Sequence, residues 1–97
     1  MQVNIKAIHF DISTALTDFI NKKVEKLVRR YPAIDTVDVT LKVVKPQTAD
    51  NKEATLSIPV AGADVQVASK TADTFEEAVD LALDAVEHKL AKIKGNK

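Results

Sequence analysis

The chain of 97 residues suits one domain and is too short for two ordinary ones. Hydrophobic residues make up 45% and aromatic residues only 4%, so a core has to be built mainly from Val, Ile, Leu and Ala. The 14 basic and 14 acidic residues give a formal net charge of zero. The total charge therefore gives no reason to expect a nucleic-acid partner.

The N-terminal part of the chain predicts a strand followed by a helix. Val3, Ile5 and Ala7 alternate with the residues between them, as in a strand. Ser13 suits a helix cap because its hydroxyl can accept a hydrogen bond from an amide of the first turn. Pro32 ends this helix at the preceding residue or slightly before. Apolar residues at spacings of three and four share one helical face: Leu16, Phe19, Ile20, Val24, Leu27 and Tyr31.

The middle of the chain predicts two further strands. Apolar and polar residues alternate over 37–43, so one side of this strand is apolar and the other is polar. Residues 45–52 are typical of a loop, and the same alternation returns over 53–58. These two strands therefore face a core on one side and water on the other.

A turn at 61–64 precedes a fourth predicted strand. We expect Val65 and Val67 to face inward, with Gln66 and Lys70 facing outward.

The last element is a long helix. Asp73 or Thr74 caps it, and Glu76 or Glu77 stands three residues later, as a capping box requires. Its apolar stripe consists of Phe75, Val79, Ala82, Val86, Leu90 and Ile93. Acids early in the helix and lysines late in it suit the helix dipole.

The order of elements predicts an α+β fold, β-α-β-β-β-α. Short connections make the last three strands an antiparallel meander, whereas the first helix is a crossover that sets the first strand parallel to a neighbour. Each strand has one polar face, so both helices should cover the same side of a four-stranded mixed sheet.

Signals for catalysis, metal binding and membrane insertion are weak. The absence of cysteine removes disulfides, thiolate ligands and thiol nucleophiles. His9 and His88, the only histidines, lack metal-binding spacing, and no glycine-rich phosphate loop or Gly-x-Ser-x-Gly motif occurs. No apolar run reaches the roughly 20 residues of a membrane span, and the start lacks a signal-peptide profile. We expect no catalytic residue, metal, cofactor or small-molecule substrate, and a cytoplasmic location.

Several residues admit a functional and a plainer interpretation. The acids of the last helix (Glu76, Asp80, Asp84 and Glu87) could form a paired-carboxylate site, but a solvated helix face is the commoner arrangement. His9 could contact RNA or titrate, and a structural or exposed histidine is more common. Tyr31 could stack on a base, although it continues the apolar face of the first helix.

Basic residues carry the stronger signal. On the first helix, five bases outnumber two acids and fall on one flank of the apolar face, at about 100° per residue: Lys22, Lys23, Lys26, Arg29 and Arg30. The end of the second helix adds His88, Lys89, Lys92 and Lys94, and Lys70 precedes that helix. If the helices pack side by side, these clusters could form one surface for the regularly spaced phosphates of RNA. A lysine-rich solvated helix face is the alternative.

The sequence resembles the short ribosome hibernation-promoting factors, also called ribosome-associated inhibitor or sigma-54 modulation proteins. The similarity covers nearly the whole chain, in the family's order and spacing. The segments that carry it are Met1-Gln2-Val3-Asn4-Ile5, Phe10-Asp11-Ile12-Ser13-Thr14-Ala15-Leu16, Lys23-Val24-Glu25-Lys26-Leu27, Glu53-Ala54-Thr55-Leu56, Val67-Ala68-Ser69, Asp73-Thr74-Phe75-Glu76-Glu77-Ala78-Val79-Asp80 and Leu90-Ala91-Lys92-Ile93-Lys94.

This resemblance implies a fold similar to double-stranded-RNA-binding domains and a non-enzymatic function. Such proteins bind the small ribosomal subunit and its rRNA in the channel for messenger and transfer RNA. They inhibit translation in stationary or starved cells. Their RNA contacts come largely from basic side chains of the two helices, which match the two basic clusters here.

The chain departs from the family pattern in places. Thr74 and Phe75 stand where Met-Tyr is common, Ala61-Gly62-Ala63 replaces a Gly-Gly turn, and His88 stands where Arg is frequent. Long-form relatives carry a second domain that pairs ribosomes, so we expect residues 1–97 to form a single ribosome-binding domain that leaves such pairing to a separate factor.

Two other functions remain open at the level of sequence. A protein-binding regulatory module, for example one that contacts the transcription machinery, would use the open sheet face and the acidic run 73–87. A small acylphosphatase-like enzyme is disfavoured because its architecture needs a final strand and a phosphate-binding glycine loop.

Overall fold

The computed structural model describes residues 2–44, 51–60, 62 and 64–95, and it has the predicted order of elements. The elements are β1 (Gln2–Ile8), α1 (Thr14–Arg30), β2 (Thr36–Val43), β3 (Lys52–Ile58), β4 (Gln66–Ala72) and α2 (Phe75–Gly95). The α+β class is therefore confirmed. Residues 45–50 of the predicted loop, and 61 and 63 of the predicted turn, lie outside the described residues.

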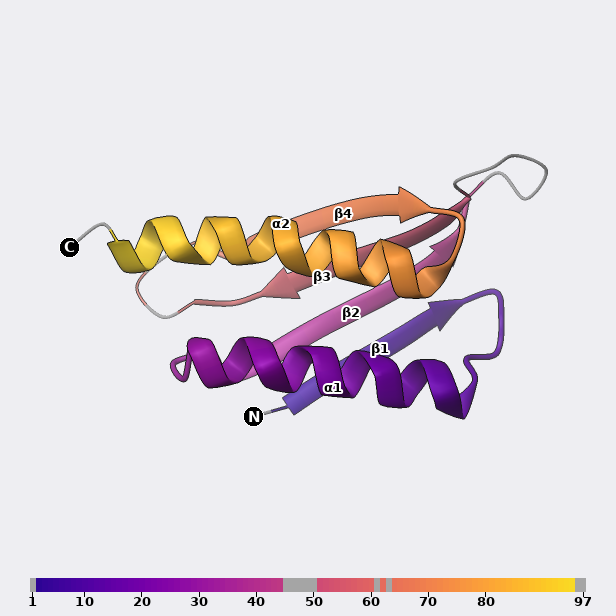
Figure 1. The fold of residues 1–97 in the computed structure, drawn as a ribbon, viewed down its shortest axis with the longest axis horizontal. Coiled ribbons are helices and arrows are strands. Elements are labelled where there is room, and N and C mark those ends of the chain that lie inside the picture. Colours follow the sequence, from indigo (N-terminus) through magenta and orange to yellow (C-terminus); the bar gives the residue numbers. More distant parts are fainter. Residues whose placement is uncertain (1, 45–50, 61, 63, 96–97) are drawn as a thin grey trace.

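The four strands form one mixed sheet in the order β1-β2-β3-β4. β1 pairs with β2 in parallel, and β3 and β4 each add an antiparallel neighbour. Both helices lie on the same face of this sheet and run in the same direction (Figure 1). The parallel pair and the two-layer arrangement follow from the crossover through α1, as predicted.

α1 begins and ends where its sequence predicts. The Ser13 hydroxyl accepts a hydrogen bond from the amide of Leu16 at 3.1 Å, which satisfies one donor of the first turn. At the other end, the backbone amide of Tyr31 donates to the carbonyl oxygens of Leu27 and Val28 just before Pro32. The buried face consists of Leu16, Ile20, Val24 and Leu27.

α2 starts after Thr74, which settles the choice between the two predicted caps. The Thr74 hydroxyl accepts from the amide of Glu77 at 3.2 Å. The predicted stripe is largely buried, with Phe75 and Ile93 half-buried at its two ends. Ala78 and Leu83 are also buried and widen the stripe beyond the prediction.

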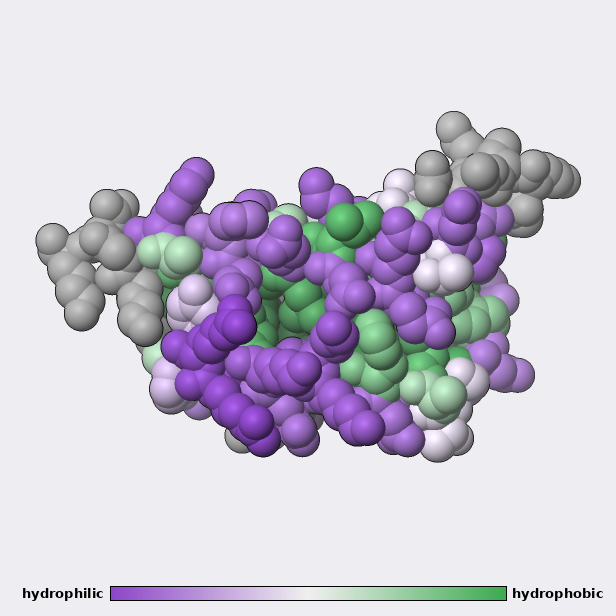
Figure 2. Space-filling model, viewed as in Figure 1, coloured by the Kyte–Doolittle hydropathy of each residue, from purple (hydrophilic) through white to green (hydrophobic). Residues whose placement is uncertain are grey.

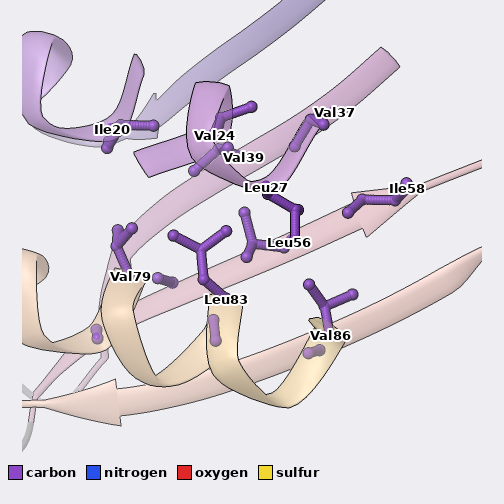
Figure 3. Close-up of a cluster of buried hydrophobic side chains, with 14 of the residues drawn as sticks. Ile20, Val24, Leu27, Val37, Val39, Leu56, Ile58, Val79, Leu83 and Val86 are labelled. Atoms are coloured by element: carbon purple, nitrogen blue, oxygen red, sulfur yellow. The ribbon is translucent and has the colours of Figure 1, made fainter. Parts of the chain in front are cut away.

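One apolar core fills the space between the sheet and the two helices. Figure 3 shows Ile20 and Val24 of α1, β2 and β3 residues beneath them, and Val79 and Val86 of α2 around a common centre. Fully burying a side chain of this size contributes roughly 1.5–3 kcal/mol. The core is therefore aliphatic, as the low aromatic content of the sequence predicts.

β4 corrects one prediction. Val65 and Val67 are 51% and 43% exposed, whereas Ala68 and Ala72 are buried. The face of β4 that was predicted to point outward is therefore the one that faces the helices. Adjacent residues of a strand point to opposite faces, so an error of one residue exchanges the two faces. Lys70 lies on this helix-covered side, opposite Ala54 of β3, and stays exposed at the sheet edge.

The connection between β1 and α1 contains an unusual backbone conformation. His9 has a φ of 63°, the only positive φ at a non-glycine position among the described residues. The next residue, Phe10, stacks on Phe75 with ring centroids 4.7 Å apart. This stacking joins the β1–α1 connection to the first residue of α2.

Candidate nucleic-acid interface

α1 presents a continuous basic side to solvent. Lys22, Lys26 and Arg29 are exposed, and they form no ion pair within the described part of the chain. They share one side of α1 because the helix turns about 100° per residue while its apolar face is fixed to the sheet. Figure 2 shows hydrophilic side chains over much of this helix layer, with hydrophobic ones visible between them.

A shallow depression lies within this basic side. Phe19 is half-buried, and the Nζ of Lys23 lies 5.4 Å from the centroid of its ring, a cation–π contact. The depression is lined by Phe19, Lys22, Lys23, Glu25, Lys26 and Arg29. It combines positive charge with an aromatic wall, as sites for RNA phosphates and unstacked bases do.

The other two bases of α1 turn towards α2. Lys23 Nζ lies 3.1 Å from a carboxylate oxygen of Asp80. The Arg30 guanidinium donates to both carboxylate oxygens of Glu87, at 2.8 and 3.0 Å. Asp80 and Glu87 belong to the run interpreted from sequence as a solvated helix face, so their role in holding α1 bases was missed.

The groove between the helices is of mixed charge. Its lining includes the bases Lys23, Lys26 and Arg30, the acids Asp80, Asp84 and Glu87, and the apolar side chains of Leu27 and Leu83. The side of α2 that meets α1 is therefore acidic. The basic clusters of the two helices do not meet in this groove, although the helices pack side by side.

Other sides of α2 carry His88, Lys89 and Lys92. His88 and Lys92 are exposed. Lys89 crosses to the edge of the sheet, where its Nζ donates to the carbonyl of Val67 at 2.5 Å. Lys70 is on the same strand as Val67. Lys94 belongs to the last turn of α2, and its side chain lies outside the described residues.

An apolar cleft of about 320 Å³ opens where the two helices end. Its walls come from the α1–β2 connection, the end of β3 and the last turns of α2, and include Tyr31, Ile34, Val60, Leu90 and Ile93. Arg30 lines one side, so the cleft adjoins the end of α1.

The described residues show no feature of two other kinds of site. None of their histidines and acids gather in groups of three that could ligate a metal ion. Neither helix, as far as it is described, has the length and apolar character of a membrane span.

Comparison with known families and proteins gives consistent matches over nearly the whole chain. The family model described as "Sigma 54 modulation protein / S30EA ribosomal protein" matches residues 3–97. The ribosome hibernation promoting factor of Azotobacter vinelandii is 36% identical over 94 residues, which is 97% of this chain and 83% of that protein. The factor of the same name from Escherichia coli K12 is 32% identical over 94 residues, covering 97% and 94%.

Solved structures share the fold. A ribosomal subunit interface protein from Coxiella burnetii superposes with a TM-score of 0.86 at 22% identity, covering 98% of this chain and 99% of that chain. The N-terminal domain of Protein Y from Thermus thermophilus gives a TM-score of 0.79 at 19% identity, covering 96% and 99%.

Proposed function

Because the chain belongs to the sigma 54 modulation protein / S30EA ribosomal protein family, we propose that it is a ribosome hibernation factor. It binds the small ribosomal subunit in the channel for messenger and transfer RNA and inhibits translation in stationary phase or starvation. The function is regulatory rather than enzymatic, and it is exerted in the cytoplasm. Relatives of the same name at 32–36% identity over nearly the full chain support this proposal.

The observation that carries the proposal is the exposed basic side of α1. Lys22, Lys26 and Arg29 are fixed on one rigid helix and point away from the core. Each base that neutralises an RNA phosphate releases counterions, so such a surface binds RNA more tightly at low salt. Folded RNA offers phosphates and shape more readily than base edges, which suits a helix without a base-reading motif. In the proposal, Lys70 and the bases of α2 form a second contact, separated from the basic side of α1 by the acidic side of α2.

Co-sedimentation with separated ribosomal subunits tests this function. The protein is mixed with small or large subunits and centrifuged through sucrose gradients at low and high salt. We expect it to migrate with small subunits at low salt and to remain at the top of the gradient at high salt. Inhibition of translation in a cell-free extract should follow the same salt dependence.

Two charge-reversal variants locate the surface. K26E/R29E reverses two exposed bases of α1, and K6E/K42E makes the same change in net charge on the open face of the sheet, where both lysines are exposed. We expect K26E/R29E to lose binding and K6E/K42E to keep it. The opposite result would move the interface to the open sheet face. If neither variant nor the wild type sediments with small subunits, hibernation activity through this surface is ruled out.

A further inference from the structure

The two ion pairs between α1 and α2 divide the bases of α1 into two sets. Lys23 and Arg30 stand two helical turns apart on α1, and Asp80 and Glu87 stand two turns apart on α2. The helices run in the same direction, so both pairs form in one register (Figure 1). Lys22, Lys26 and Arg29 form the second set, without ion pairs among the described residues.

Helix packing does not require these ion pairs. The apolar contacts beneath them already hold α1 and α2 to the sheet, with Val24 and Val79 fully buried. Both pairs are well exposed, with side-chain exposures of 36% and 49% for Lys23 and Asp80, and of 67% and 33% for Arg30 and Glu87. Exposed ion pairs contribute little to folding stability because water and salt screen them.

The same carboxylates have a larger effect on an approaching polyanion. A phosphate that recruits Lys23 must displace Asp80, and one that recruits Arg30 must displace Glu87 from a two-oxygen contact. After displacement, each carboxylate remains beside the phosphate and repels it. Asp84 lines the same groove and adds to this repulsion.

We propose that Asp80 and Glu87 are specificity-determining residues of the RNA interface. They withhold Lys23 and Arg30 from phosphates, so Lys22, Lys26 and Arg29 carry the electrostatic attraction to RNA of arbitrary sequence. Binding to such RNA is thereby kept weak, and only a partner that fits the whole surface binds tightly. This inference rests on the proposed function, since it concerns discrimination by the same basic side of α1.

The first test removes the two carboxylates. D80N/E87Q is compared with D64N/E53Q, which makes the same change in net charge at exposed and half-exposed positions away from the groove. The probe is a short fluorescein-labelled RNA duplex of arbitrary sequence, and anisotropy is followed across a salt series. D80N/E87Q should bind the duplex about tenfold more tightly than wild type, with a steeper dependence of log K on log salt by one to two phosphate contacts. D64N/E53Q should change much less.

The second test removes each set of bases in turn. K23A/R30A/D80N/E87Q deletes both ion pairs without leaving a carboxylate unpaired, and K26A/R29A deletes two bases of the second set. If the carboxylates withhold Lys23 and Arg30, the first variant should retain most of the wild-type affinity for the duplex, whereas K26A/R29A should lose about tenfold. Circular dichroism of every variant checks that the fold is intact.

Discrimination is measured by co-sedimentation with small subunits under the same salt conditions. The ratio of small-subunit affinity to duplex affinity should fall for D80N/E87Q and stay near the wild-type value for D64N/E53Q. Equal duplex affinities for D80N/E87Q and D64N/E53Q, or equal losses for K23A/R30A/D80N/E87Q and K26A/R29A, would show that the two carboxylates do not restrict RNA binding. A wild-type protein that binds duplex but not small subunits would reject the proposed function while the duplex comparison still decides whether the carboxylates screen the bases.

Discussion

Ser13 caps the first turn of α1, the helix whose later turns carry the basic side. Its hydroxyl satisfies an amide that would otherwise lack a partner. We expect Ser13→Ala to lower the free energy of unfolding by about 1 kcal/mol, as measured by urea denaturation. Ser13→Asn restores an acceptor and should stay close to wild type. Equal stability of Ser13→Ala and Ser13→Asn would show that the capping bond is not significant in solution.

His9 holds a backbone conformation that side chains disfavour. At a φ of 63°, its Cβ approaches the backbone, at a cost of roughly 1–2 kcal/mol for an ordinary residue. Glycine has no Cβ, so His9→Gly should match or exceed the wild-type melting temperature. His9→Val, with a branched side chain, should lower it. A more stable valine variant would mean that this connection is not left-handed in solution.

At the scale of elements, β4 provides a direct test of strand orientation. Val67 faces solvent and Ala68 lies under the helix layer. Val67→Thr should change the free energy of unfolding by less than about 0.5 kcal/mol. Ala68→Leu forces a larger side chain into a packed space and should cost about 1–3 kcal/mol. Chemical denaturation measures both, and the reverse order of effects would restore the orientation predicted from sequence.

The other elements were predictable because their patterns agree with one another. Large apolar residues alternate with polar ones along β2 and β3, and both helices have caps and continuous apolar stripes. In β4, hydrophobicity predicted that the valines would be buried. Ala68 and Ala72 are buried instead, because the space between β4 and α2 accommodates the small side chain of alanine. That room is set by the packing of distant elements, which a local pattern does not contain.

At the scale of the whole molecule, one apolar cluster connects every strand and both helices. A single core of this size should unfold in one cooperative step. The single tyrosine, Tyr31, packs against this core and provides an intrinsic fluorescence signal. We expect the urea transitions followed by tyrosine fluorescence and by far-UV circular dichroism to coincide. Separate midpoints would reveal a part of the molecule that unfolds on its own.

The candidate site was predictable only in part. Helical periodicity alone placed five bases on one flank of α1, and the structure keeps that arrangement. Which of them meet the acids of α2 depends on the register between two helices far apart in the chain. The register follows from how both helices pack on the sheet, so the division into paired and unpaired bases was not available from spacing.

The common direction of the two helices separates charge along the helix layer. The first turn of α2 contains Glu76 and Glu77, and the last turn of α1 contains Arg29 and Arg30, so these charges lie at opposite ends of the helix layer. These full charges outweigh the opposing half-charges of the helix dipoles. The layer is therefore an electric dipole, although the chain as a whole has a formal net charge of zero. A polyanion at a distance would turn the molecule before touching it, so that collisions begin with the basic end leading.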